Sequence, residues 1–555
     1  MGTAGLSGLQ FLGLSFFHPV AYPDYPGYLV KKLMPKLLSL KPLHLAIEIL
    51  CAFWKQHPAA LYALSLFLGF RMALAWDWTL SIPCFLIWGP LLFPSSRGFR
   101  SHLLLTVTLP LIAICYTATH FHFPELPKEG TSGTGHIEIN SVSSTSSHFG
   151  QGWLYKCTLH NFVSNEGKES IAHGIPCTLS IPKECKRPLA NQDYIVKGTL
   201  KELAPHRYAL KVSLQNPWAP VPGTWSLAEY RWLAKKKVSS YIHRHTPSFS
   251  SANFLIAIAT GEFDDQQMLF DFGRLGLQHI LAISGFHFSI VALFLSFLLR
   301  CFLPEKQTAM VVILLLSSYY LFLGWGPSIQ RAWITIMIYF CGKLLEKTAL
   351  PLNCLAIAMI LVMLSSPLSC ESIGFQFSFL ATAAILFFYS EADTLLQKLL
   401  KKRPLDLMAD MSGVSQHGYV LLSCFRQAVA ITLAVHIAVV PLTLYQFHKF
   451  PWLSLLYNLF FPFLVSLSMG LLLLAAGLTA LLPPLGRLLH LANSSYTDFI
   501  LSYPQNAPAS LDSSWRVTSL SLPFITGYLS ILLLGGIIIK HIADKKRERE
   551  QDLFF

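Results

Sequence analysis

Charged residues are scarce in this chain. Only 13% of its 555 residues are Asp, Glu, Lys or Arg, whereas 53% are hydrophobic. Soluble domains usually carry about 25% charged residues, so this composition excludes an ordinary soluble protein. Apolar windows of about 20 residues recur along the sequence, and each is long enough to cross a hydrocarbon core of roughly 30 Å. The sequence therefore predicts a polytopic α-helical membrane protein.

The common catalytic and metal-binding motifs are also missing. The eleven cysteines include no CxxC pair, and the sequence contains no HxHxDH, GxxxxGK[ST] or GxSxG motif. These absences argue against a zinc or redox centre, a nucleotide-driven pump and a serine hydrolase. No pair of carboxylates lies within the apolar runs. We therefore predict no catalytic residue, no metal, no cofactor and no enzymatic activity.

The positions of lysine and arginine predict how the first apolar runs are oriented. Residues 1–58 are expected to form a cytoplasmic or interfacial lead, because they contain five lysines. No cleavable signal peptide is expected there. Apolar runs at 59–76, 78–94 and 102–120 form the predicted N-terminal transmembrane region, 59–120. Because positive charge favours the cytoplasmic side, the chain should emerge on the opposite side after the third run.

Residues 130–225 differ in composition and contain no membrane-length run. Five short segments are alternating or β-branched and are separated by turn-forming residues: 135–142, 153–162, 175–182, 193–203 and 207–214. Five strands in so short a stretch are typical of a small barrel. We therefore expect a small all-β, OB-fold-like soluble insert on the extracytoplasmic side of the membrane.

The charge and aromatic content of this insert suggest a nucleic-acid surface. Between residues 135 and 215 there are nine Lys or Arg against six Asp or Glu. OB-folds hold single strands by stacking bases on aromatic rings beside basic residues. The candidate DNA contacts are Trp153, Tyr155, Lys197, Tyr208 and Lys211. The alternative is that the aromatic side chains fill the barrel interior.

Three cysteines fall in the same insert: Cys157, Cys177 and Cys185. In an oxidising compartment they could form one disulfide and leave one odd thiol. The sequence leaves the pairing open.

Residues 226–250 form a basic amphipathic connector helix that is expected to lie along the membrane surface. Its two open roles are a plain connector and a collar that faces DNA. A second transmembrane region is predicted at 251–485, followed at 486–555 by a C-terminal segment with a last transmembrane helix and a basic tail. The total expected is ten to eleven spans. Keeping the tail cytoplasmic requires either that 452–482 splits at Pro462 and Gly470 or that 488–503 adds a crossing.

Polar residues gather where these later spans begin. His279, Ser284, Gly285 and His287 open one predicted helix, Ser328 and Arg331 lie on one face of the next, and Gln376 opens a third. His436 and Asn458 lie inside two further runs. Each has an ordinary explanation, such as an arginine that snorkels to the headgroups or a hydrogen bond between helices. Together they predict the lining of one hydrated passage.

At these residues the chain resembles the ComEC family, the DNA-uptake channels of bacterial natural transformation. The resemblance covers about 250–480 and is carried by five stretches: 257–262 (AIATGE), 279–287 (HILAISGFH), 327–332 (PSIQRA), 374–379 (GFQFSF) and 444–450 (LYQFHKF) leading to Asn458 and Pro462. The five-strand insert also matches the position of the family's OB-fold domain. One departure is Glu262, where the family often has aspartate.

The resemblance implies that 251–485 is a competence channel domain in the bacterial inner membrane. It would pass single-stranded DNA from the periplasm to the cytoplasm, with His279, Ser284, Gly285, His287, Ser328, Arg331, Gln376 and Asn458 along its path. The family's C-terminal metallo-β-lactamase-like domain is expected to be missing here. The implied partners are the lipid bilayer, a periplasmic DNA-binding receptor, a separate nuclease and a cytoplasmic helicase; a homo-oligomer stays open.

Two other classes of function compete with this interpretation. A secondary transporter of a small anionic solute would also use helix N-termini and polar groups at mid-membrane. It gives no reason for a basic, aromatic β-insert. A membrane-embedded transferase that uses His287 as a base would normally require partner carboxylates, which the sequence lacks.

Overall fold

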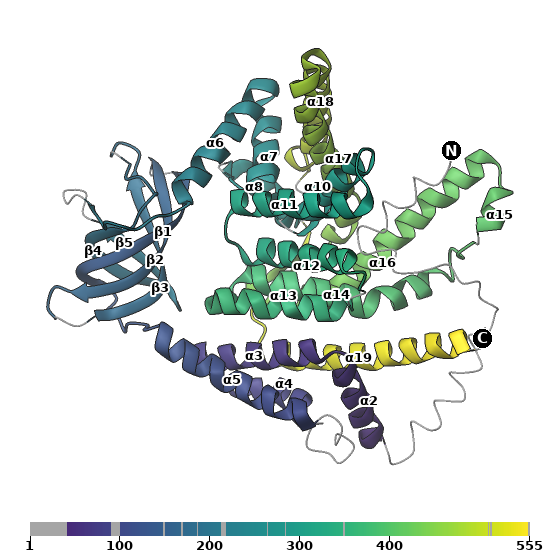
Figure 1. Ribbon diagram of the computed structural model, residues 1–555, viewed down its shortest axis with the longest axis horizontal. Coiled ribbons are helices and arrows are strands. Elements are labelled where there is room, and N and C mark those ends of the chain that lie inside the picture. Colours follow the sequence, from purple (N-terminus) through teal and green to yellow (C-terminus); the bar gives the residue numbers. More distant parts are fainter. Residues whose placement is uncertain are drawn as a thin grey trace.

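The computed structural model describes residues 42–552, except 90–99, 148–149, 168–169, 186, 213–217, 264, 284, 348–349, 404, 509 and 511–512. It contains a helical body with a β-barrel at one end (Figure 1). This arrangement confirms the predicted class, a polytopic helical protein with a small β-insert.

The β-barrel is built from five strands that follow the predicted segments closely. These are β1 (Thr131–Ser147), β2 (Gly150–Ser164), β3 (Ser170–Pro182), β4 (Tyr194–Ala204) and β5 (Arg207–Val212). The strand order is β1-β2-β3-β5-β4, and a further pairing of β1 with β4 closes the barrel. All these pairings are antiparallel except β3 with β5. A short strand β6 (Ala219–Pro220) extends the sheet beside β4.

Alternating side chains fill the barrel interior. Along β2, Tyr155, Cys157 and Leu159 are almost fully buried, and they share one face because successive strand residues point to opposite sides. Tyr208 of β5 is likewise 3% exposed. The expectation that Tyr155 and Tyr208 contact DNA is therefore wrong, because both rings are part of the barrel core. The alternative of a filled interior holds for them.

The first helices are α2 (Pro42–Gln56), α3 (Pro58–Leu74), the short pair η2 (Trp78–Leu80) and α4 (Ser81–Trp88), and α5 (Arg100–His120). Helices α2 and α3 meet at an angle of 99°. Trp54 of α2 is 1% exposed, so this part of the expected lead belongs to the helical core; residues 1–41 lie outside the described part. Gly69 lets α3 approach α5, since a Cβ there would lie 2.5 Å from the Cα of Pro110.

A basic helix then joins the barrel to the main helical body. This helix is α6 (Ala228–His245), and it is followed by α7 (Phe249–Thr260), α8 (Gln266–Arg274) and the single turn α9 (Gln278–Leu281). The main body contains α10 (Gly285–Arg300), α11 (Glu305–Leu323), α12 (Pro327–Leu344), α13 (Pro351–Ser365), η5 (Pro367–Glu371) and α14 (Ile373–Leu396). The predicted helix that begins at His279 is thus two helices, with a break at 282–284.

The C-terminal part contains α15 (Leu405–Ala409), α16 (Gly413–Phe447), α17 (Ser454–Leu481), α18 (Pro483–Gln505) and α19 (Leu522–Asp552), with a two-stranded sheet of β7 (Lys449–Pro451) and β8 (Ser514–Arg516). Helix α17 continues through Pro462 and Gly470, so the predicted split of this run is wrong. A helix, α18, does form over the alternative run at 488–503, but it is not among the described helices that are long and apolar enough to cross a membrane.

Fewer helices reach membrane length than the sequence suggested. By length and composition, five helices in the described residues could span a membrane, and six if the bent pair of α2 and α3 counts as one. We expected ten to eleven spans. The run at 78–94 is too short where it is described, and α10 and α13 have 16 and 15 residues. At 1.5 Å per residue, such helices reach only about 24 Å.

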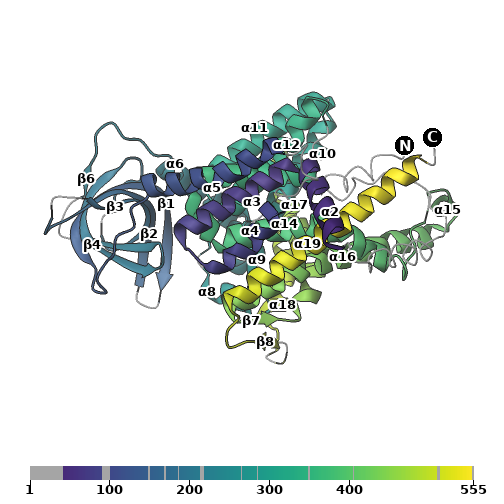
Figure 2. The same cartoon turned by 90° about the horizontal axis from the view of Figure 1, so that it is seen from below.

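An exposed lysine-rich loop lies at the end of the helical body away from the barrel. Helices α3, α11, α12, α14 and α19 lie roughly parallel, and the barrel covers one end of them (Figures 1 and 2). The end of α19 and the loop before α16 lie at the other end. That loop carries Lys398, Lys401, Lys402 and Arg403, which are all exposed.

Candidate functional site

Three parallel helices begin beside one another at the barrel end of the body: α10, α12 and α14. The starts of α12 and α14 are joined by Ser328, whose Oγ donates a hydrogen bond to the carbonyl oxygen of Gly374 at 3.0 Å. The start of α14 is itself capped by Ser372, which accepts a hydrogen bond from the backbone of Phe375. The predicted polar helix starts therefore meet, rather than facing separate surfaces.

Arg331 connects all three helices. Its Nε donates a 2.7 Å hydrogen bond to Ser378 Oγ on α14. Its Nη2 lies against the first residue of α10, since a Cβ built on Gly285 would be 2.4 Å away. Glycine is required there for the guanidinium to approach the backbone so closely. Ser328 and Arg331, which are three residues apart, thus both face α14, as their spacing predicted.

The electrostatics of this junction favour an anion. The first backbone N–H groups of a helix have no partner within the helix, and the macrodipole places partial positive charge there. Three such ends converge beside one guanidinium. The nearest described carboxylate on these elements is Glu371, just before α14, and it is already paired with Arg71 at 3.2 Å and with His206 at 2.9 Å.

Gln376 extends the polar lining toward α16. Its Nε2 donates to the carbonyl oxygen of Cys370 at 3.1 Å, and its Oε1 accepts from Gln446 at 3.3 Å. Gln446 belongs to 444–450, one of the stretches that carry the family resemblance. These bonds hold a side-chain amide one turn inside α14, beside the turn of Ser378.

The histidines lie next to this junction. His287 lies in the first turn of α10 and is only 1% exposed, whereas His279 in α9 is exposed. His279 is within electrostatic range of both His287 and His436.

Two predicted path residues are less well tied to the junction. Ser284 lies outside the described residues. Asn458, one turn into α17, has a buried Oδ1 with no hydrogen-bond partner among the described residues. The start of α17 does approach α9, because a Cβ on Gly276 would lie 2.8 Å from Ser454 Cβ. No described contact links Asn458 directly to Arg331.

The remaining candidates in the barrel are accessible. Trp153 is half-buried at the end of β2, and Lys197 and Lys211 are exposed. Lys211 lies opposite Thr199 in the register of β4 and β5, so it shares an outward face with Lys197, two residues before Thr199. Trp153 packs instead against Trp232 of α6, with ring centroids 5.7 Å apart.

Sequence reasoning missed a polar face on α18. His490 accepts or donates a 3.0 Å hydrogen bond with Tyr241 of α6, and Asp498 accepts bonds from Ser248 at 2.5 Å and Ser251 at 2.7 Å. The signal was present in the sequence, since polar residues recur there at spacings of three and four: 490, 493, 494, 497 and 498. They face protein, so α18 does not have the uniformly apolar character of a lipid-facing helix.

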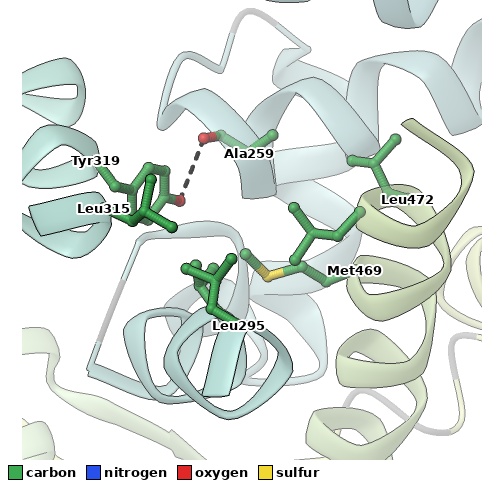
Figure 3. Close-up of a pocket in the computed structure, with 8 residues that line it drawn as sticks. Ala259, Leu295, Leu315, Tyr319, Met469 and Leu472 are labelled. Carbon is green, nitrogen blue, oxygen red and sulfur yellow. Dashed lines mark hydrogen bonds between the residues drawn. The ribbon is translucent and has the colours of Figure 1, made fainter. Parts of the chain in front are cut away.

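An apolar cavity lies apart from these polar groups. It has a volume of 240 Å³ and lies among α7, α10, α11 and α17 (Figure 3). Figure 3 shows Leu295, Leu315 and Met469 pointing into it, while the hydroxyl of Tyr319 is turned to the carbonyl of Ala259 at 3.3 Å. A cavity with this lining offers no partner to a phosphate. The polar junction around Arg331 is therefore the better candidate site.

The chain is similar to known proteins over the region that contains the junction. The model of the Competence protein family matches residues 259–541, just over half of the chain, and this span includes every residue of the junction. The chain belongs to the Competence protein family. No solved structure matches it.

Similar proteins with curated descriptions match only in part. ComE operon protein 3 of Bacillus subtilis is 24% identical over 219 residues, which are 38% of this chain and 27% of that protein. An uncharacterized protein of Mycoplasma pneumoniae, the MG316 homolog, is 31% identical over 193 residues, 34% of this chain and 42% of its own length. The matches thus span less than half the length of each of these relatives.

Proposed function

We propose that this competence protein is the inner-membrane channel that passes single-stranded DNA into the cytoplasm during DNA uptake. The observation that carries the proposal is the position of Arg331, enclosed by the starts of three parallel helices. A DNA strand carries one negative charge per phosphate, so its path through a membrane requires cations and hydrogen-bond donors. Family membership and the name of the Bacillus subtilis relative support a role in competence.

The junction suits a moving polyanion better than a fixed ligand. Arg331 supplies one cation, and the helix starts supply partial charges that do not depend on protonation. Around them lie hydroxyls and amides, which bind a backbone without reading its bases. In this proposal Ser328, Arg331 and Gln376 contact the strand directly, while Gly285 and Ser378 hold the guanidinium in position.

The barrel is the proposed extracytoplasmic DNA-handling domain. Its closed five-strand topology supports an OB-type fold, and it lies at the end of the body opposite the exposed lysine-rich loop. Lys197 and Lys211 offer accessible cations on its β4–β5 face. A periplasmic receptor would deliver the DNA, and a separate nuclease and a cytoplasmic helicase would act before and after passage.

Replacing Arg331 tests the proposal. Arg331→Ala should reduce entry of labelled DNA into the cytosol by at least tenfold without changing the amount of protein in the membrane. Arg331→Lys keeps the positive charge but loses the hydrogen bond from Nε. Its DNA uptake should therefore lie between that of Arg331→Ala and that of the unmodified protein. Arg487→Ala is the matched control, because Arg487 is an exposed helix residue with no ion pair in the described part of the chain. Normal uptake with Arg331→Ala would remove this residue from the DNA path.

A transporter for a small anion is the second candidate, since converging helix N-termini also suit a single anionic group. The two functions differ in what reconstituted protein conducts. Arg331-dependent flux of inorganic phosphate in proteoliposomes, together with uptake of DNA that does not depend on Arg331, would favour the transporter.

A further inference from the structure

The outward side of α6 is a row of cations. Exposed side chains recur at spacings of three and four along it, from Leu233 through Lys236, Lys237 and Ser240 to Arg244. These residues, with Tyr241, line a surface groove of 370 Å³. Lys236, Lys237 and Arg244 have no carboxylate partner among the residues that the structure describes. Lys235 is different, since it is turned inward toward Glu262 at 3.9 Å, and burial lowers its pKa.

The row continues onto the barrel through two tryptophans. Lys236 lies over the ring of Trp232 at 5.1 Å. On the same ring, the guanidinium of Arg187 lies 4.1 Å from the centroid, and it also lies 5.5 Å from the ring of Trp153. Arg187 is held in place by a double hydrogen bond to Glu229. Cations and aromatic rings therefore alternate from the end of β2 to the far end of α6.

The barrel end of α6 lies near the proposed channel mouth. Arg231, on α6, donates from Nε to the carbonyl of Leu321 at 2.9 Å and from Nη1 to that of Asn140 in β1 at 3.0 Å. It therefore fixes α6 to both the barrel and the last turn of α11. Three residues after α11 ends, α12 begins with the turn that carries Ser328 and Arg331. The groove and the junction thus lie at the same end of the body.

We propose that this face of α6, together with Trp153 and Trp232, is a binding track that delivers a DNA single strand to the channel. The inference rests on the proposed function and assigns it a strand-binding site. Lys236 and Arg244 are eight residues apart, or about 12 Å along the helix. At about 3.4 Å of helix axis per phosphate in one B-form strand, that length covers between about three and four phosphate spacings. Trp232 orients two of the cations, because Arg187 and Lys236 both lie over its ring.

A strand fits this face better than a membrane surface does. A helix that lies in the lipid interface needs an apolar face to insert among the acyl chains. The apolar side of α6 is covered by protein, since it packs against α7, α11, α18 and β1 and Ile242 is 1% exposed. The outward face that remains is basic, and Tyr230 and Leu233 are also exposed toward its barrel end. The proposal takes up the alternative of a collar that faces DNA.

The test measures binding of fluorescein-labelled oligo(dT) to the full-length protein in nanodiscs, by anisotropy at several salt concentrations. The triple variant K236Q/K237Q/R244Q removes three cations from the track. Each lost phosphate contact lowers the slope of log K against log salt by about 0.7, so the slope should fall by about 2. Raising the salt from about 50 to about 200 mM lowers the affinity by some factor, and this factor should be roughly 20 times smaller for the triple variant than for the unmodified protein. The matched control K398Q/K401Q/K402Q removes three exposed cations at the opposite end and should bind as the unmodified protein does.

Tryptophan variants test the support that this ring gives to the cations. Trp232→Leu removes the ring over which Arg187 and Lys236 lie and should weaken binding about 2- to 30-fold, whereas Trp232→Phe should keep most of the affinity. The track would be overturned if K236Q/K237Q/R244Q bound oligo(dT) with unchanged affinity and salt slope. It would also be overturned if this variant lost a co-purified anionic lipid, read by native mass spectrometry, but still bound oligo(dT). Either result leaves the channel proposal standing, because DNA uptake by Arg331→Ala is measured separately.

Discussion

Gly285→Ala separates the position of the Arg331 guanidinium from its charge. A Cβ at residue 285 would lie 2.4 Å from Arg331 Nη2, and ordinary contact begins near 3.4 Å. The guanidinium must therefore move by about 1 Å, which alanine can force because the contact is the far end of a flexible side chain. Such a shift lengthens the 2.7 Å bond to Ser378 beyond hydrogen-bonding distance.

The expected energies make this variant informative. A hydrogen bond to a charged group stabilises by about 1.5–3 kcal/mol. Replacing glycine by alanine in a helix gains about 0.5–1 kcal/mol, so the net loss of stability should be only about 1–2 kcal/mol. The protein should fold and insert normally. DNA uptake should nevertheless fall by about tenfold, because a misplacement of the guanidinium worth about 1.4 kcal/mol changes a rate or equilibrium tenfold.

The assay is entry of labelled DNA into the cytosol, divided by the amount of the protein in the membrane. Gly470→Ala is the control, since Gly470 lies in α17 and a Cβ there meets nothing within 4 Å. It should leave uptake unchanged. If Gly285→Ala took up DNA normally while Arg331→Ala did not, charge alone would matter and the close approach would have no role.

Three further predictions concern the barrel and its attachment. Cys157 and Cys177 lie directly opposite each other in β2 and β3, so in an oxidising compartment they should form the disulfide and leave Cys185 free, as thiol labelling with mass spectrometry can check. Glu371→Gln should release the β4–β5 turn from the body at a cost of about 1.5–3 kcal/mol, seen as faster amide exchange there alone. A hydrogen bond to Glu138 raises the pKa of His160. The stabilisation of the barrel by this histidine should therefore be full below pH 6.5 and lost as pH rises through the raised pKa, and His160→Gln should abolish this pH dependence in thermal unfolding.

Local patterns in the sequence were enough to predict the protein class and the five strands. The strands alternate, and the helices are long apolar runs, so neighbouring residues alone carry the signal. The same alternation could have shown that Tyr155 is buried, because it has the same parity along β2 as Leu159. The prediction failed at Tyr155 and Tyr208 because it considered residue type without the face of the strand.

Contacts between distant segments could not be predicted in this way. That Ser328 and Arg331 share a face follows from helical spacing, but that the face meets Ser378 and Gly285 depends on how three helices pack. The count of spans failed for a related reason. Helices such as α13 are apolar but short, and α18 is long but polar because its polar side chains find partners on α6 and α7.

The junction contains a single arginine, whereas a cluster of arginines would bind a strand more tightly. A single arginine is consistent with a site that a strand passes through rather than one that retains it. Conduction requires binding that is strong enough for entry and weak enough for release. Arg331 gives one charge-assisted contact, and its Nε is already committed to Ser378. The helix starts add donors that a phosphate can exchange as it advances. Cations in greater number lie outside the junction along α6, where a strand would be captured in water and where salt screens each contact.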